Sequence, residues 1–324
     1  GRRRPLIIAM ALFFLASFGC ALAPNIFVFI AMRFIQGFAI SAGTISGAIV
    51  RDLYSGTELT KFFALLTMIR SLAPLLAPIS GGIVIYYASW TGVFVVLGLA
   101  GIALTIISIW KVKETLPAER RVPGNFRQLM MNFYSLLRSR AFMGYALVQG
   151  MMAAGIFAYI SGTTFVYQKV YGVSSQTFSV LFALNGISLI LGSQLVKRLA
   201  GRVRENRILL AGLSLAILSS TTALIIILAH GPLFALVVAL FFFVAANGIT
   251  GPSSFSLAMN AQGHIAGSAA ALLGAMPFLM GSGTSPLVGI AGEYSAVPLG
   301  VIIVCCSLLS LLAYVFLVKK VENA

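Results

Sequence analysis

Residues 111–140 read KVKETLPAERRVPGNFRQLMMNFYSLLRSR, a polar and basic stretch in a chain that is otherwise largely apolar. Apolar stretches of about 20 residues, long enough to cross a bilayer as helices, lie on both sides of it. Four precede it at residues 5–23, 26–50, 62–88 and 91–110, and six follow at 141–168, 178–196, 208–229, 233–259, 265–292 and 297–318. This pattern predicts a first helical half at 1–110, a basic linker at 111–140 and a second helical half at 141–324.

The overall composition is typical of a membrane protein. Of the 324 residues, 60% are hydrophobic and 9% are charged, and the mean hydropathy is +1.02. Soluble domains carry about 25% charged residues. Barrel strands would alternate in hydrophobicity over about 10 residues, so the long apolar stretches indicate helices instead. The sequence therefore predicts an all-α, multi-pass membrane protein in contact with the lipid bilayer.

The distribution of positive charge predicts the orientation. If the N-terminus is cytoplasmic, all but three of the 22 Lys and Arg residues fall on the cytoplasmic side or in the loops that adjoin it. The exceptions are Arg33 and Arg70, which lie inside spans, and Lys169, which faces outward. This bias predicts that both termini are cytoplasmic. Because topology accounts for the net charge of +15 and no recognition motif accompanies it, no nucleic-acid partner is expected.

Nothing in the sequence indicates an enzyme. The three cysteines, Cys20, Cys305 and Cys306, lack metal-ligand spacing and are interpreted as small buried hydrophobes. No nucleotide-binding loop and no Ser, His and acid set on an aqueous surface is present. We therefore expect no cofactor and no metal; a membrane enzyme or a non-transporting receptor remains as a remote alternative.

Internal repetition suggests two related halves. The second half runs as two helices, a basic loop at Lys197 to Arg202, and four more helices, whereas the first half begins with the basic residues Gly1 to Arg4 and four helices. If the halves are parallel repeats, as in some transporter folds, two helices precede Gly1. The chain would then hold ten of twelve transmembrane helices, as four plus six.

Several motifs carry a family resemblance. Residues 1–5 (GRRRP), 33–37 (RFIQG) and 71–82 (SLAPLLAPISGG) are similar to motifs of the drug:proton antiporters of the major facilitator superfamily. An Ala-Pro stands where many members have Gly-Pro. Residues 51–54 (RDLY) and 113–121 (KETLPAERR) resemble the bicyclomycin-resistance (Bcr/CflA-type) branch.

That resemblance implies a function. It implies a monomeric, multi-pass protein of the bacterial inner membrane that exports small amphiphilic drugs, such as antibiotics, against inward proton flow by alternating access. A secondary transporter that exports a metabolite, such as an amino acid, nucleoside or sugar, is the alternative, because the same scaffold carries such substrates.

Two arginines inside spans are candidates for coupling. A guanidinium at the bilayer centre costs about 3 kcal/mol on insertion scales, so Arg33 and Arg70 should face protein or a water-filled cavity. Arg33 belongs to the motif that includes Gln36 and Gly37; its alternative role is a structural cation bonded to carbonyls and Gln36. Arg70 lies close enough to the start of its span to snorkel to the cytoplasmic face.

The segment with Pro74, Pro78, Gly81 and Gly82 predicts a bent and tightly packed helix. Each proline removes an intrahelical hydrogen bond, and the glycines allow another backbone to approach closely. The resemblance implies that this segment lies at the interface of the halves and limits leak. Generic helix packing is the alternative.

Acids at the cytoplasmic end of the second span predict a latch. Asp52 is placed to pair with Arg2 or Arg3, and such a pair would break when the cytoplasmic side opens. The resemblance makes this the family's charge-relay position. A simple solvated loop is the alternative, because exposed ion pairs contribute only about 0–1 kcal/mol.

Polar and bulky side chains interrupt the apolar spans of the second half. Gln149, Met152, Tyr159, Asn185 and Asn247 are predicted to line a midplane cavity that accepts amphiphilic substrates of varied shape. Interhelical hydrogen bonds and ordinary packing are the alternative for each of them.

The chain's seven acidic residues leave a gap in this scheme. They are Asp52, Glu58, Glu114, Glu119, Glu205, Glu293 and Glu322. Proton coupling normally needs a titratable group inside the membrane, and none of these lies near the middle of a span. We expect the coupling acid upstream of Gly1, with Arg33 as the charge that tunes its pKa; coupling through another group is the alternative.

Overall fold

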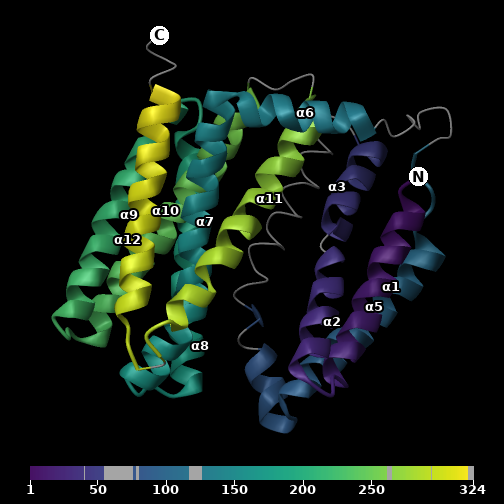
Figure 1. Cartoon of the computed structure of the whole chain (residues 1–324), viewed down its shortest axis with the longest axis horizontal. Helices are drawn as coiled ribbons and strands as arrows, with labels where there is room; N and C mark the ends of the chain where they lie inside the picture. The colour runs from purple at the N-terminus through teal and green to yellow at the C-terminus, as the bar shows by residue number, and fades with distance from the viewer. Residues whose placement is uncertain are drawn as a thin grey trace. The chain divides into compact units, whose positions relative to one another are not determined.

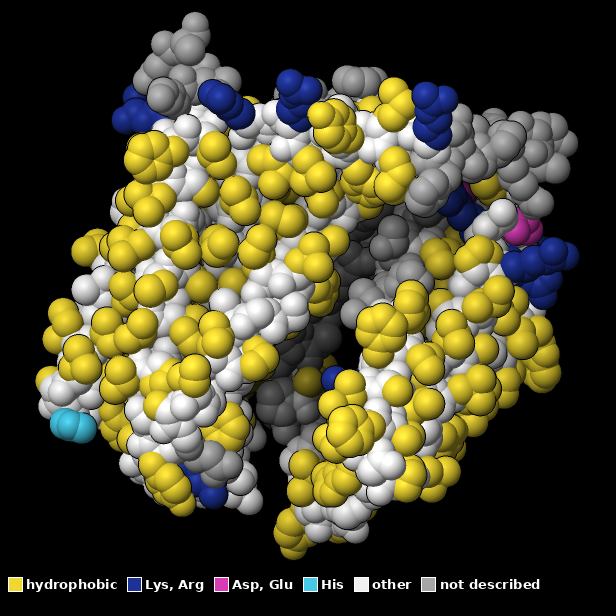
Figure 2. All heavy atoms as spheres, viewed as in Figure 1, with side chains coloured by type: hydrophobic (Ala, Val, Ile, Leu, Met, Phe, Trp, Pro, Cys, Tyr) yellow, Lys and Arg dark blue, Asp and Glu magenta, His cyan; other side chains and the backbone are white. Residues whose placement is uncertain are grey.

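The computed structural model describes residues 1–39, 41–54, 76–77, 80–116, 126–260, 265–292 and 294–319. These ranges are helical apart from short connections, and they contain no β-strand. The chain divides into two compact units, Gly1–Gly124 and Asn125–Ala324, each of them a helical bundle (Figure 1). In each unit hydrophobic side chains cover the flanks of the helices, and Lys and Arg side chains gather at one end (Figure 2).

In the described part of the first unit, α1 is the helix around which three others pack. The labelled helices are α1 (Arg3–Ala21), α2 (Ile26–Phe38), α3 (Ser41–Leu53) and α5 (Trp90–Lys111), and residues 80–87 are also helical. α1 contacts α2, α3 and α5. A Cβ added to Gly101 of α5 would lie 2.7 Å from the Cβ of Phe14 on α1. The glycine therefore permits a close contact between these two helices.

A side-chain cap fixes where α2 begins. Asn25 accepts a hydrogen bond from the backbone N–H of Val28 at 2.9 Å through its side-chain oxygen, which satisfies one of the donors left free in the first helical turn. The apolar stretch predicted as one span at 26–50 then continues as two helices, α2 and α3, of 13 residues each.

The second unit holds seven α-helices within its described residues. They are α6 (Phe126–Arg138), α7 (Arg140–Phe165), α8 (Ser175–Leu199), α9 (Glu205–Leu228), α10 (Leu233–Asn260), α11 (Ala266–Thr284) and α12 (Val297–Ala313). The π-helical turns η2 (Val166–Val170) and η5 (Tyr314–Lys319) extend α7 and α12, and the 3₁₀ turn η4 (Pro286–Gly289) follows α11. α10 packs against α7, α8 and α9, while α7 also packs against α11 and α12.

The crossing of α8 and α10 is the closest helix contact of this unit that depends on glycine. A Cβ added to Gly192 would lie 2.2 Å from the carbonyl oxygen of Ala245, and one added to Gly248 would lie 2.3 Å from that of Leu189. Both obstacles are backbone atoms, which cannot swing aside as side chains can. The two glycines therefore set the distance between the helices.

The predicted linker at 111–140 contains a helix. Its last part forms α6, which lies across the end of the second bundle (Figure 1) and contacts α7 and α11. Leu136 is fully buried in this contact. The division between the compact units accordingly follows Gly124, so α6 belongs with the second bundle.

Within the described residues, eight helices are long and apolar enough to cross a membrane. They correspond to eight of the ten predicted spans, and they support a multi-pass membrane protein. Of the other two, the stretch 26–50 forms the shorter helices α2 and α3. The stretch 62–88 lies mostly outside the residues that the structure describes.

Candidate functional site

Arg33 is held by a chain of hydrogen bonds between α2 and α1. Its Nη1 donates to Oε1 of Gln36, one helical turn further along α2, at 2.5 Å. The Nε2 of Gln36 donates to Oγ of Ser17 on α1 at 2.8 Å, and Ser17 in turn donates to the carbonyl of Phe13 at 2.6 Å. Gln36 is 7% exposed. The buried amide therefore connects the guanidinium to the neighbouring helix.

The guanidinium of Arg33 also lies over an aromatic ring. Its Cζ is 5.8 Å from the ring centroid of Phe94 on α5, a distance at which the ring's negative face attracts a cation. Phe29 packs edge-on against Phe94, with ring centroids 5.4 Å apart. Arg33 is otherwise exposed, and no atom of the described residues lies within 4 Å of a Cβ added to Gly37. The cation is thus fixed on one side and accessible on the other.

A second polar site lies at the end of the first unit where α1 begins. Nε of Arg2 is 3.1 Å from Oδ2 of Asp52, which lies in the last turn of α3. The hydroxyl of Thr115 donates to the same carboxylate oxygen at 3.2 Å. Arg3 points elsewhere, since its Nη2 donates to the carbonyl of Ile109 at 2.7 Å. The predicted acid–base contact therefore forms with Arg2 of the two candidate arginines.

Glu114 extends this site. Its Oε1 accepts a hydrogen bond from the backbone N–H of Arg2 at 2.7 Å and another from that of Leu116 at 3.2 Å. The bond from Arg2 lowers the pKa of Glu114 to about 2, because it stabilises the ionised carboxylate. Arg2 is thus bound by Asp52 through its side chain and by Glu114 through its backbone.

The remaining coupling and motif residues are less fully placed. Arg70, Pro74 and Pro78 lie outside the described residues. Gly81 and Gly82 lie in the helical residues 80–87, and no atom is found within 4 Å of a Cβ added to either glycine. The close backbone contact expected at these glycines is therefore not made within the described part of the first unit.

In the second unit Tyr159 and Asn185 meet in a buried cluster between α7 and α8. The Tyr159 ring stacks on Phe182, with centroids 5.6 Å apart, and Nδ2 of Asn185 donates to the hydroxyl of Tyr167 at 3.5 Å. Tyr159 is 3% exposed and Asn185 0%. The hydroxyl of Tyr159 and Oδ1 of Asn185 make no hydrogen bond of good geometry with the described residues. Within the described residues, the cluster thus contains two buried polar atoms that could still form hydrogen bonds, in surroundings that are otherwise apolar.

The other predicted cavity residues have different surroundings. Met152 is 1% exposed in the packed core of the second unit, which agrees with the packing alternative for this residue. Asn247 donates to the carbonyl of Phe243 on its own helix at 3.2 Å. Gln149 is half-buried, and its Oε1 is buried without a hydrogen-bond partner among the described residues.

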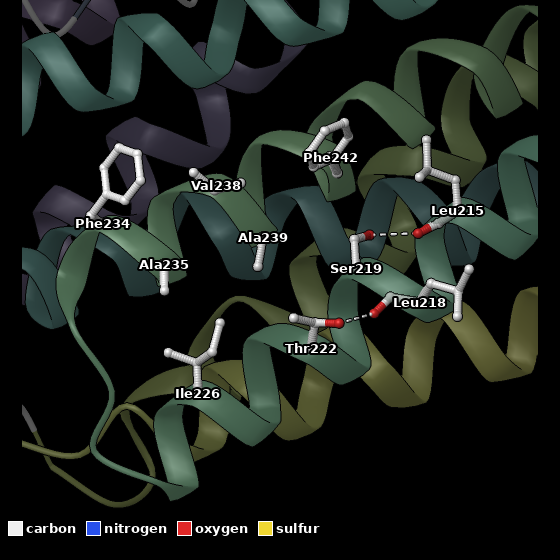
Figure 3. Close-up of a pocket in the computed structure, with 10 residues that line it drawn as sticks. All are labelled: Leu215, Leu218, Ser219, Thr222, Ile226, Phe234, Ala235, Val238, Ala239 and Phe242. Atoms are coloured by element: carbon white, nitrogen blue, oxygen red, sulfur yellow. Dashed lines mark hydrogen bonds between the residues drawn. The ribbon is translucent and has the colours of Figure 1, made fainter.

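A groove of about 450 Å³ runs between α9 and α10 (Figure 3). It is lined by aliphatic and aromatic side chains together with the hydroxyls of Ser219 and Thr222. Both hydroxyls donate to carbonyls of their own helix, Ser219 to Leu215 at 2.6 Å and Thr222 to Leu218 at 2.8 Å. The groove therefore presents almost only apolar atoms, and none of the predicted cavity residues lines it.

Three residues that complete these sites, Ser17, Phe94 and Tyr167, were not named in the sequence analysis, and Glu114 and Thr115 appeared there within the 113–121 motif without a predicted contact. Ser17 and Tyr167 interrupt apolar stretches in the same way as the polar residues that were singled out, and this signal was available for both. Phe94 and Thr115 carried no such signal, because aromatic residues are common in spans and Thr115 lies in a polar loop. Their roles depend on contacts between helices.

Comparison with known proteins gives a consistent result. The model of the Major Facilitator Superfamily matches residues 1–286. An uncharacterized MFS-type transporter, YdgK of Bacillus subtilis (strain 168), is 46% identical over 323 residues, which are 99% of this chain and 80% of that protein. A bicyclomycin resistance protein homolog of Haemophilus influenzae is 29% identical over 293 residues, 90% of this chain and 74% of the relative.

A solved structure shares the fold. It is a bacterial homolog of the human lysosomal transporter Spinster, in an inward-facing and unoccupied conformation, and it superposes with a TM-score of 0.74. The match covers 98% of this chain and 82% of that one at 14% sequence identity. At this identity the likeness concerns the fold.

Proposed function

The chain belongs to the Major Facilitator Superfamily of transporters, and from this premise we propose that it is a proton-coupled exporter of small amphiphilic compounds such as antibiotics. It would act as a monomer in the bacterial inner membrane, with both termini in the cytoplasm. The similarity to a bicyclomycin resistance protein homolog and the motifs of the bicyclomycin-resistance branch in the sequence support a drug-like substrate.

The observation that carries the proposal is the anchored guanidinium of Arg33. Within the span it donates to Gln36, which is itself bonded to Ser17 on the next helix, and it stacks over Phe94. A cation held in place but accessible on one side stabilises a nearby carboxylate in its ionised form and lowers the pKa of that acid. We propose that Arg33 performs this task for the proton-carrying group of the transport cycle.

The Arg2–Asp52 pair is the proposed cytoplasmic latch. It joins the residue before α1 to the end of α3, and Glu114 and Thr115 bind the same two partners from the segment after α5. Movement of α3 away from α1 and from the segment after α5 would break the bonds of Asp52 to Arg2 and Thr115 together, while Glu114 would keep its bond to the backbone of Arg2. Because the site is exposed, water can replace them at small cost, as a contact that opens and closes in every cycle requires.

For the substrate we propose polar contacts from Gln149, Tyr159, Asn185 and Asn247 within the second half. The support for three of them is unused hydrogen-bonding capacity: among the described residues, Oε1 of Gln149, Oδ1 of Asn185 and the hydroxyl of Tyr159 are buried without bonds of good geometry. Asn247 is included as a buried amide whose Nδ2 donates only to the carbonyl of Phe243 on its own helix in this part of the chain. A few such groups among apolar and aromatic side chains suit amphiphilic molecules that differ in shape.

An efflux assay tests the proposal. Cells expressing the protein should accumulate less of a panel of antibiotics and amphiphilic dyes than cells with an empty vector, and a protonophore should abolish the difference. Arg33→Ala should abolish efflux at unchanged protein level, while Lys197→Ala, at an exposed position after the membrane-spanning part of α8, should not. Unchanged accumulation across the panel would contradict a drug substrate, and export of a labelled metabolite would favour the alternative transporter.

A further inference from the structure

Helix α6 has a bundle-facing side and an exposed apolar side. Leu136 is fully buried, and Phe133 packs against the core cluster of the second unit. Met130, Tyr134 and Leu137 follow the spacing i, i+4, i+7 and form a single stripe along the helix. All three are exposed, Tyr134 by 64%. The bundle therefore covers only part of the apolar surface of α6.

Two arginines border this stripe. Arg127 and Arg138 are both exposed, and Nη1 of Arg138 is 3.5 Å from the hydroxyl of Tyr134. Seven and four residues separate Tyr134 from Arg127 and Arg138, so the three side chains lie along one side of the helix. In the described parts of the chain neither arginine forms an ion pair with a carboxylate. Their charges are available to an anionic partner.

The position of α6 along the membrane normal follows from its connection to α7. Only Ser139 separates the last residue of α6 from Arg140, the first residue of a 31-residue apolar segment that can span the membrane. α6 lies across the end of that bundle (Figure 1). A helix tied so closely to the start of a span, and lying across it, is held at the boundary between hydrocarbon and headgroups.

The same end of the second unit is basic. Figure 2 shows Lys and Arg side chains along the edge of this unit where α6 lies, with hydrophobic side chains between them. Exposed cations from the last turn of α8 and the connection to α9, including Lys197, Arg202 and Arg204, belong to this end. An anionic surface is therefore the complement of both the helix and its surroundings.

We propose that α6 docks on the headgroups of anionic phospholipids in the cytoplasmic leaflet. The side chains of Met130, Tyr134 and Leu137 enter the interfacial region, and Arg127 and Arg138 bind lipid phosphates. The phenol ring of Tyr134 suits this depth, because its ring is apolar and its hydroxyl is polar. The docked helix would hold the cytoplasmic end of α7 at a fixed depth. This inference concerns lipid contact and does not rest on the proposed substrate or on proton coupling.

A reporter at position 134 tests where the stripe lies. The variant Tyr134→Trp, made in a chain that carries Trp90→Phe and Trp110→Phe, places the sole indole of the chain on α6. The protein is reconstituted in vesicles of phosphatidylcholine with or without phosphatidylglycerol. Brominated acyl chains should quench this indole, and aqueous iodide should quench it weakly. Quenching by iodide alone would place the stripe in water, and quenching by neither would place protein over it; either result overturns the proposal.

A charge comparison tests the anionic preference. Phosphatidylglycerol retained by the purified protein is measured by native mass spectrometry. Arg127 and Arg138 border the stripe that enters the interface, and each is expected to contribute about a fivefold preference through its lipid phosphate, so Arg127→Gln with Arg138→Gln should lower retention by about 25-fold. Arg202→Gln with Arg204→Gln, at the same end but off α6, is the matched control and should lower it far less. Equal losses in the two double variants would overturn the role of α6, and Arg127→Lys with Arg138→Lys should preserve retention.

Discussion

Arg2 and Asp52 lie 50 residues apart in the sequence, yet Nε of Arg2 is 3.1 Å from Oδ2 of Asp52. The contact joins the residue before α1 to the end of α3, and its members remain partly accessible, with side-chain exposures of 31% and 17%. An ion pair in such a setting contributes little free energy to folding. We expect the pair to affect the position of α3 relative to α1 instead.

Asp52→Asn should therefore separate transport from stability. The amide keeps the size of the side chain and loses the negative charge that Arg2 binds. We expect the free energy of unfolding to change by about 0–1 kcal/mol, while the efflux rate falls severalfold. The exchanged pair, Arg2→Asp with Asp52→Arg, should recover part of the rate. If the exchange transports no better than Asp52→Asn alone, the latch interpretation is wrong.

The low pKa of Glu114 predicts a defined pH window. Its folded pKa of about 2 lies below the ordinary value of 4.5, so the carboxylate stabilises the folded chain at pH values above 4.5. That contribution should be lost as the pH falls from 4.5 toward 2. The unfolding temperatures of wild type and Glu114→Gln, measured in detergent, should differ by a constant amount above pH 5 and converge below pH 4. A difference that stays constant down to pH 3 would contradict this assignment.

The chain of hydrogen bonds from Arg33 through Gln36 to Ser17 predicts different effects for substitutions of Gln36 and of Ser17. Gln36→Leu removes the acceptor for Arg33 and the donor to Ser17, and should cost about 1–3 kcal/mol of unfolding free energy and abolish efflux. Ser17→Ala removes the bond from Gln36 to α1, together with the bond of Ser17 to the carbonyl of Phe13, and leaves Arg33 bonded to Gln36, so efflux should persist. Equal loss of efflux in both variants would show that contact between the helices, and not the position of the guanidinium, is what transport needs.

Local spacing explains which of these contacts could be predicted. Gln36 follows Arg33 by three residues, and a helix brings such positions together, so a bond between them could be named from the sequence, where it stood as the alternative role of Arg33. Ser17 lies on another helix, and a serine in an apolar span gives no indication of its partner. The choice of Arg2 over Arg3 for Asp52 depends on the direction in which each side chain leaves the start of α1, which no motif encodes.

Composition predicted the membrane-spanning helices but not α6. Long apolar stretches identified eight helices that can span a membrane, because burial in hydrocarbon requires that composition. α6 was assigned to a linker, since its basic and polar residues outweighed the apolar spacing of Leu129, Phe133 and Leu136 when only composition was considered. The contact of α6 with α7 and α11 is a tertiary feature that fixes its place.

Asn185 allows the substrate role to be separated from packing. The residue is fully buried, and its Oδ1 has no hydrogen bond of good geometry among the described residues, so the amide is costly in an apolar setting. Asn185→Leu should leave the unfolding temperature unchanged or raise it. If Asn185 binds substrate, the same variant should reduce efflux of some compounds in the panel and spare others. Strong destabilisation would instead assign the amide a structural role.

The glycine crossing of α8 and α10 yields the sharpest stability prediction. A methyl group at position 192 or 248 would lie 2.2 or 2.3 Å from a backbone carbonyl oxygen of the facing helix, so the helices must move apart. Overpacking of this kind costs about 1–3 kcal/mol, which exceeds the gain of up to about 1 kcal/mol in helix propensity from glycine to alanine. Gly192→Ala and Gly248→Ala should therefore lower the unfolding temperature. Gly251→Ala is the matched control, because Gly251 lies on α10 only three residues beyond Gly248 and no atom of the part of the chain that the structure describes lies within 4 Å of its added Cβ. It should keep or raise the unfolding temperature, and equal effects at positions 248 and 251 would show that the two helices are not in backbone contact.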